Sequence, residues 1–220
     1  MVKIKDFHSK RNKVSLVKIK KEKYIYKVHS KENSFNLEKN FYLKLQENKN
    51  NFINVPRLIS YKDGSKTIFL QYVEGTTLLE ELELLEEKNN KKAEMDSANL
   101  IIALYKWIED FYKLDFVKKE KFYLNDINFR NFIIKDGEIY GIDFEDITKD
   151  RKREDIAEII AFYLTYDPCF TNFKNSVIEK VIQYLTKEKK LKHKELNQNI
   201  KDELEKIQER RSKRKKWWLL

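Results

Sequence analysis

Glycine, cysteine and histidine are scarce in this 220-residue sequence. Only four glycines occur, none before Gly64, and their spacing excludes both the Walker phosphate loop and the glycine-rich dinucleotide fingerprint. A single cysteine, Cys169, excludes disulfides within the chain and multi-cysteine zinc sites, and it fits a reducing compartment. The three histidines, His8, His29 and His193, are too scattered in sequence to indicate a metal-binding motif.

Long hydrophobic runs are also absent, and the lysine-rich start lacks the apolar core of a signal peptide. We therefore expect a cytoplasmic protein with no membrane span. Apolar side chains make up 41% of the chain and charged ones 37%, which is typical of a globular protein with a real core.

The formal net charge is +10, and segment 209–216 supplies six positive charges and one negative. About half of the excess charge is therefore local, and the remaining body is only mildly basic. The basic segment is a candidate contact for RNA or a protein partner, and a solvated surface is an equally good interpretation.

The first third of the chain has the pattern of a small β-rich lobe. Residues 14–29 alternate apolar and charged side chains around a Lys-Lys-Glu-Lys turn, which predicts an antiparallel hairpin. Over 34–47 apolar residues recur every three or four positions, which predicts a helix capped by Ser34. Residues 67–73 predict a further strand.

Helical periodicity dominates the remainder. One strand pair interrupts it, 132–134 and 138–142, joined by Asp136-Gly137, a strong hairpin signal. The predicted helices cover residues 77–87, 93–114, 154–166 and 175–210.

These patterns predict an α+β fold with two lobes. The predicted parts are a β-rich nucleotide lobe with one helix at 1–72, a hinge at 73–76, a helical lobe with an embedded hairpin at 77–208, and a basic, aromatic tail at 209–220.

Asp126 and Asn131 form the pattern D-x-x-x-x-N, which by itself carries little information. Asp167 and Asn172 repeat the same spacing elsewhere in the chain, so chance accounts for such pairs. What distinguishes the first pair is its context, because Asn131 leads directly into the predicted hairpin.

Hairpin geometry brings chemically useful side chains together. A two-residue turn at 136–137 pairs Asn131 with Ile142 and places Asn131 and Asp143 at the same open end of the hairpin. An amide oxygen and a carboxylate, with Asp126 just upstream, make a hard-oxygen site suited to Mg²⁺ held together with nucleotide phosphates.

The segments LNDINFRNFII, IYGIDFED and REDIA resemble the catalytic core of the protein-kinase-like superfamily. The resemblance is greatest to its aminoglycoside phosphotransferase and choline kinase branch, whose loop aspartate, metal strand and later helix start match Asp126, Ile142–Glu145 and Asp155–Ala157. It extends over about residues 9 to 165. A bilobal protein-kinase-like fold is therefore expected.

This resemblance implies an enzyme that moves the γ-phosphate of ATP to an alcohol group of a small molecule. It implies that Asp126 meets the acceptor hydroxyl, that Asn131 and Asp143 hold Mg²⁺, and that Asp155 supports the catalytic loop from behind. For Asp155, a simple helix N-cap is the alternative interpretation.

The nucleotide site follows from the same resemblance. Lys27 resembles the lysine that neutralises the phosphates, and Glu38 resembles its helix partner. Tyr72-Val73 resembles the hinge, with Val55-Pro56 as its approach, and Asn12 belongs to the phosphate-covering loop. The alternative is that Lys27 is one solvated lysine among many and Glu38 an exposed helix charge.

Two departures from the family pattern stand out. Segment 9–14 has no glycine where relatives have two, so lysine and arginine side chains are expected to replace backbone N–H groups as phosphate donors. Leu124 occupies the position of the loop histidine, so an apolar packing contact is expected there instead.

The acceptor is not encoded in any motif. Two other classes stay open: a compact protein kinase or ATPase similar to the small RIO-like kinase of the KEOPS tRNA-modifying complex, and a nucleotide-binding pseudokinase. Aromatic residues after the metal strand form either an acceptor pocket or ordinary core: Phe162, Tyr163, Tyr166, Phe170 and Phe173.

Overall fold

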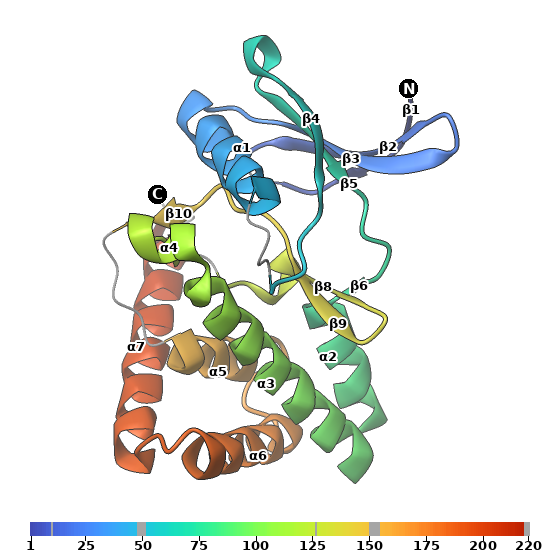
Figure 1. The fold of residues 1–220 in the computed structure, drawn as a ribbon. Helices are drawn as coiled ribbons and strands as arrows, with labels where there is room; N and C mark the ends of the chain where they lie inside the picture. Colours follow the sequence, from blue (N-terminus) through green and yellow to red (C-terminus); the bar gives the residue numbers. More distant parts are fainter. Residues whose placement is uncertain (10, 48–51, 126, 150–154, 218–220) are drawn as a thin grey trace. The chain divides into compact units, whose positions relative to one another are not determined.

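The computed structural model describes residues 1–220 except 10, 48–51, 126, 150–154 and 218–220 (Figure 1). The chain divides into two compact units. The first comprises Met1–Leu78 and Glu109–Arg151, and the second comprises Leu79–Ile108 and Lys152–Leu220. The first unit thus contains the predicted β-rich lobe together with the hairpin and residues 142–145, the predicted metal strand, which form no β-strand in the structure.

A five-stranded antiparallel sheet forms the centre of the first unit, in the order β1-β2-β3-β5-β4. The predicted hairpin is confirmed as β2 and β3, joined through Lys20, whose φ is 56°. The sequence analysis does not predict β1, an edge strand whose side chains are largely exposed. The strands are β1 (Val2–Phe7), β2 (Lys13–Ile19), β3 (Glu22–Val28), β4 (Leu58–Lys62) and β5 (Thr67–Gln71), with the short helix η1 (Asp63–Ser65) between the last two.

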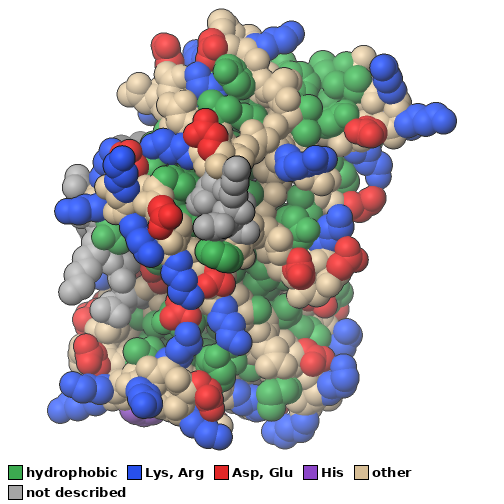
Figure 2. All heavy atoms as spheres, in the orientation of Figure 1, with side chains coloured by type: hydrophobic (Ala, Val, Ile, Leu, Met, Phe, Trp, Pro, Cys, Tyr) green, Lys and Arg blue, Asp and Glu red, His purple; other side chains and the backbone are tan. Residues whose placement is uncertain are grey.

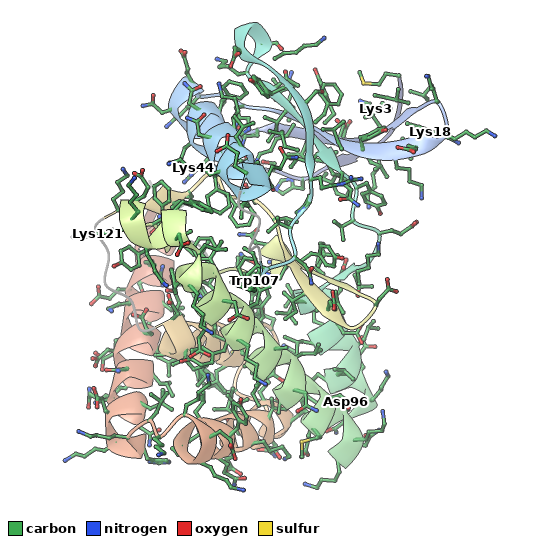
Figure 3. All side chains as sticks on the ribbon, viewed as in Figure 1. Lys3, Lys18, Lys44, Asp96, Trp107 and Lys121 are labelled. Atoms are coloured by element: carbon green, nitrogen blue, oxygen red, sulfur yellow. The ribbon has the colours of Figure 1, made fainter. Side chains whose placement is uncertain are left out.

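Strand β3 is the middle of this sheet and is paired on both sides. In its register Lys27 lies opposite Val14 of β2 and Ile68 of β5. At the other end of the sheet, the labelled Lys3 and Lys18 project from β1 and β2 (Figure 3). Lys27 is buried, whereas Lys3 and Lys18 are exposed to water.

Helix α1 (Glu32–Glu47) packs against β4 and β5. It begins two residues before the predicted start, so Ser34 lies within the first turn and does not precede the helix as a cap. The stripe that it buries is apolar except for one carboxylate: Phe35, Glu38, Phe41, Tyr42 and Leu45.

The predicted hairpin in the second half of the chain is confirmed. It is formed by β8 (Phe132–Lys135) and β9 (Glu138–Gly141), and both turn residues have positive φ, 52° at Asp136 and 80° at Gly137. This is the geometry of a type I′ turn. The other short elements of the first unit are β6 (Thr76–Thr77) beside β8, α4 (Asp115–Glu120), β7 (Tyr123–Leu124) paired with β10 (Ile147–Thr148), and η2 (Phe129–Asn131).

The second unit is helical. The single helix predicted over 175–210 is wrong, because the chain turns between α6 and α7. Lys190 has a φ of 54°, and the N–H groups of Lys189 and Leu191 both donate to Leu185 O, which ends α6. The helices are α2 (Leu78–Lys88), α3 (Lys91–Lys113, whose last turn belongs to the first unit), α5 (Asp155–Thr165), α6 (Asn172–Glu188) and α7 (His193–Trp217).

Helix α5 is the centre of the second unit and packs against α6 and α7. Its Ile159 and Ile160 are fully buried, and Trp107 of α3, labelled in Figure 3, is 6% exposed. Helix α7 continues past the predicted tail boundary at residue 209, and Arg211 donates to Thr165 O at 2.8 Å. Part of the predicted tail is therefore attached to the end of α5.

Basic side chains do not gather in one place on the face seen in Figure 2, where they alternate with acidic and apolar ones. Among the described residues, no helix is both long and apolar enough to cross a membrane.

The turn of the second hairpin provides a test of its backbone. Gly137→Val should lower the free energy of unfolding by about 1–3 kcal/mol, because a β-branched residue resists positive φ. A Cβ at this position meets no atom within 4 Å, so any loss comes from the backbone and not from a clash. Gly137→Asn, which tolerates this conformation, is the control. Equal urea midpoints for the two variants would contradict the turn geometry.

The contact between α7 and α5 provides a second test. Arg211→Ala removes the guanidinium donor to Thr165 O and should cost about 1 kcal/mol in the free energy of unfolding. Lys201→Ala, on an exposed position of the same helix, should change it by less than about 0.5 kcal/mol. If both variants melt like the native protein, the end of α7 does not stabilise the second unit.

Candidate active site

A buried ion pair joins the central strand to α1. Lys27 Nζ lies 2.8 Å from Glu38 Oε2, and the two side chains are 6% and 0% exposed. The interpretation of these residues as a solvated lysine and an exposed helix charge is therefore wrong. Because an ion pair in this position has lost most of its hydration, it is stable only with close geometry and further polar partners.

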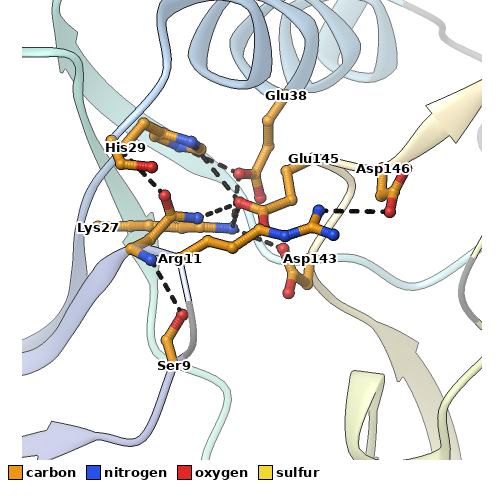
Figure 4. A network of polar contacts seen from close by, with 10 residues as sticks. Ser9, Arg11, Lys27, His29, Glu38, Asp143, Glu145 and Asp146 are labelled. Carbon is orange, nitrogen blue, oxygen red and sulfur yellow. Dashed lines mark hydrogen bonds and ion pairs between the residues drawn. The ribbon is translucent and has the colours of Figure 1, made fainter. Parts of the chain in front are cut away.

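Lys27 also contacts two carboxylates of the segment that follows β9 (Figure 4). Its Nζ lies 2.6 Å from Asp143 Oδ1 and 3.0 Å from Glu145 Oε2. One ammonium thus faces three carboxylates, all within the first unit. The predicted neighbours Lys27, Glu38 and Asp143 are brought together, although they lie far apart in sequence.

The charges in this cluster shift one another. Burial disfavours the charged ammonium, but the three carboxylates outweigh it and raise the pKa of Lys27 above its ordinary value. Burial likewise opposes the charge on Glu38, yet Lys27 and His29 hold the pKa of Glu38 below its ordinary value. Desolvation, together with the negative charges of Glu38 and Glu145, raises the pKa of Asp143 to about 6 against the pull of Lys27.

Asp143 stands at the point where the hairpin strand ends. Ile142 N donates to Asn131 O at 2.8 Å, which confirms the predicted pairing at the open end of the hairpin. Asp143 has a φ of 66°, a conformation that aspartate tolerates better than most residues, and its side chain is 40% exposed. Its carboxylate therefore meets Lys27 on one side and solvent on another. Asp126, the predicted catalytic residue, lies outside the described residues.

Phe144 fixes the segment between the two carboxylates. Its ring stacks on Phe41 at 4.4 Å between centroids and meets Tyr42 edge-on at 5.5 Å. Phe111 extends the same aromatic cluster. Phe41 and Tyr42 lie one turn after Glu38 on α1. A single face of this helix therefore positions both Glu38 and the segment that carries Asp143.

Side chains of the loop before β2 contact the segment that follows Asp143. Asn12 Nδ2 donates to Glu145, and Asn12 Oδ1 accepts from Ser30 N at 3.1 Å. Next to it, Arg11 forms an ion pair with Asp146 at 3.5 Å. These contacts connect the loop to the segment that follows Asp143. The expectation that the loop binds phosphates stays a prediction.

The segment before Asp126 is anchored as well. Leu124 is 7% exposed and pairs with Ile147, which is the apolar contact expected in place of a histidine. Asn125 N donates to Asp146 O at 3.1 Å, and Asn125 Nδ2 donates to Asp146 Oδ1 at 3.0 Å. Two hydrogen bonds therefore join the start of the predicted catalytic loop to the segment that follows Asp143.

The predicted hinge residues differ in their surroundings. Val73 is 7% exposed. Tyr72 is half-buried, with Lys23 Nζ 5.6 Å from its ring centre, and it lines an open hollow of about 380 Å³. A direct role of either residue in nucleotide binding stays a prediction.

The predicted residues of the second unit are placed as follows. Asp155 is the first residue of α5, and its supporting role stays a prediction. Of the aromatic residues after the metal strand, Tyr163 and Phe173 are 2% and 5% exposed, whereas Phe170 is 51% exposed. The space beside Tyr163 is about 10 Å³, too small for a substrate. Core packing, the alternative interpretation, therefore explains Tyr163 and Phe173.

Sequence analysis missed two residues of the cluster, His29 and Glu145. His29 Nε2 lies 3.1 Å from Glu38 Oε2, and its Nδ1 lies 3.7 Å from Glu145 Oε2. A signal for His29 was present, because residues two apart on a strand share a face and Lys27 is two residues earlier. Glu145 lies two residues after Asp143, the predicted metal ligand, and from the sequence it was noted only as part of the family motif.

Comparisons with known proteins identify the type of fold. No family model matches the sequence, and no curated protein matches it. Among solved structures, the chain is similar to a WaaP kinase in complex with acyl carrier protein, with a TM-score of 0.56 and 11% identity over 92% of this chain and 88% of that one.

The chain has a protein-kinase-like fold. This confirms the predicted architecture of an antiparallel β-sheet and a helical region. The hairpin of β8 and β9, predicted within the helical lobe, belongs instead to the first unit. A further similar structure is the Cydia pomonella granulovirus kinase PK-1, with a TM-score of 0.48 and 16% identity over 66% of this chain and 53% of that one. The aminoglycoside phosphotransferase and choline kinase branch stays a prediction.

Breaking the Lys27–Glu38 ion pair should show how much it contributes to the free energy of unfolding. Lys27→Met should lower the free energy of unfolding by about 3–5 kcal/mol, because Glu38 keeps a buried charge without its lysine. Lys27→Met with Glu38→Gln should recover part of that loss, since the buried negative charge is gone. Lys113→Met, which breaks an exposed pair with Asp110, is the control and should cost less than about 1 kcal/mol. Equal urea midpoints for the Lys27 and Lys113 variants would contradict the assignment.

Proposed function

We propose that this protein is an ATP- and Mg²⁺-dependent phosphotransferase that moves the γ-phosphate to a hydroxyl group of a small molecule. The observation that carries the proposal is the buried Lys27–Glu38 pair, placed 2.6 Å from Asp143 in a protein-kinase-like fold. A lysine kept charged in a partly dry site is suited to polyanion recognition. Phosphoryl transfer depends mainly on such positioning and charge stabilisation.

Lys27 is suited to hold donor phosphates. Its pKa is raised, so it carries a positive charge throughout the physiological range. Its contact with Asp143 is the one that a phosphate would replace, because Asp143 is 40% exposed whereas Glu38 is fully buried. Glu38 then keeps the ammonium in place while its other contacts change.

The predicted ligands are of the kind that suits a magnesium ion. Asp143, next to Lys27, offers a carboxylate, and Asn131, paired through its backbone with Ile142, offers an amide oxygen; both are hard ligands of the kind that Mg²⁺ prefers. The cluster has more carboxylates than described cations, and a divalent ion would balance that excess. When bound, Mg²⁺ would neutralise charge on the transferring phosphate. Asp126, by the family resemblance, would orient the acceptor hydroxyl and take up its proton.

The resemblance to the aminoglycoside phosphotransferase and choline kinase branch favours a small-molecule acceptor. The experiment compares such acceptors with a protein substrate. Purified protein would be incubated with labelled ATP and Mg²⁺ against panels of amino alcohols, aminoglycosides and sugars, with a general protein substrate in parallel. Transfer to a small hydroxyl compound supports the proposal. Transfer only to protein favours the RIO-like alternative, and ATP binding with no transfer favours the pseudokinase.

Substitutions of Asp126 and Asp143 should affect nucleotide binding and phosphoryl transfer differently. Asp126→Asn should lower the rate by about 100-fold or more while leaving Mg·ATP affinity nearly unchanged, because this side chain meets the acceptor. Asp143→Asn should weaken Mg·ATP binding as well, which calorimetric titration would measure. Asp136→Asn, on the exposed hairpin turn, is the matched control and should affect neither. An Asp126→Asn variant with more than about a tenth of the native rate would contradict the assigned role.

A further inference from the structure

His29 is the second basic side chain of the buried cluster. Its side chain is fully buried, with Nε2 3.1 Å from Glu38 Oε2 and Nδ1 3.7 Å from Glu145 Oε2. Its backbone N–H donates to Lys66 O at 2.9 Å, and its ring meets Phe35 edge-on at 5.7 Å. The imidazole is therefore fixed by backbone and packing contacts in a position between two carboxylates.

The same carboxylate oxygens bind Lys27. Glu38 Oε2 lies 2.8 Å from Lys27 Nζ and 3.1 Å from His29 Nε2, and Glu145 Oε2 is also shared between the two basic residues. Lys27 and His29 are two residues apart at the end of β3, so their side chains lie on one face of the sheet (Figure 4). Glu38 thus has one basic neighbour, Lys27, that a phosphate can attract, and one, His29, that it does not displace.

Nucleotide binding changes the balance of this cluster. When a phosphate replaces the contact between Lys27 and Asp143, Glu38 must keep its position for the ammonium to stay aimed at that phosphate, although the phosphate draws the positive charge away from the buried carboxylate. Glu145 also accepts from Asn12. Among the described residues, the basic groups that contact Glu38 are Lys27 and His29. His29 is therefore the group that can fix Glu38 independently of Lys27.

We propose that His29 is a positioning residue of the nucleotide site: it holds Glu38 in place, so that Lys27 stays aimed at the donor phosphates. This inference rests on the proposed phosphotransferase function. His29 does not touch the nucleotide, and its whole effect passes through Lys27.

Two substitutions separate hydrogen bonding from packing. His29→Leu fills the space but cannot donate, and it should raise the Mg·ATP dissociation constant about 10- to 100-fold, the size of a lost hydrogen bond to a charged group. His29→Gln retains an N–H donor and should stay within about threefold of the native value. His8→Leu, exposed on the same unit, is the control and should leave the constant unchanged. Circular dichroism at the assay temperature verifies that each variant is folded.

A double-mutant cycle tests whether the effect passes through Lys27. In a Lys27→Met background, adding His29→Leu should change the Mg·ATP dissociation constant by less than about twofold, because no lysine remains to be positioned. A merely structural role would weaken binding equally in both backgrounds. That outcome, or equal affinities for the Leu and native proteins, would overturn the inference.

The failure of this inference and that of the proposed function are distinguishable. If the native protein binds Mg·ATP and Lys27→Met weakens binding while His29→Leu does not, the function stands and the role of His29 is wrong. If the native protein does not bind Mg·ATP at all, both are overturned.

Discussion

A lysine ammonium held away from water among three carboxylates is the interaction on which the first unit depends. Lys27 can remain charged there only because Glu38, Asp143 and Glu145 lie within about 3 Å of it. Lys27 comes from a strand, and its partners come from a helix and from the segment after a hairpin. The requirement to surround one charge therefore ties together elements that are distant in sequence, and a displacement of any of them leaves a buried charge unpaired.

Apolar packing supplies the rigidity that this charge cluster needs. Phe144 lies between Asp143 and Glu145 and is packed against Phe41 and Tyr42 of α1, the helix that also carries Glu38. The aromatic contact and the ion pair thus stabilise the same arrangement. Because aromatic rings bury a large area and prefer defined geometries, they hold the carboxylates more firmly than a solvated loop would.

Several features of the fold follow from local sequence patterns. Alternation over residues 14–29 predicts β2 and β3, and Asp136-Gly137 predicts a turn with positive φ that sets the register up to Asn131. The break between α6 and α7 did not follow, because residues 189–192 contain neither glycine nor proline. A lysine in the left-handed conformation ends that helix, and nothing local marks it.

The sequence by itself determined the periods of the strands and helices, the register of the second hairpin and, with that register, the place of Asp143, because these depend on spacing along the chain. Lys27 and Glu38 were candidates only through the family resemblance. Only the tertiary structure decided that Lys27 and Glu38 are buried and that His29 and Glu145 complete the cluster around them. Burial and partnership depend on which distant segments pack together. Local sequence patterns therefore indicate candidate residues, whereas tertiary packing determines which charged groups surround each of them.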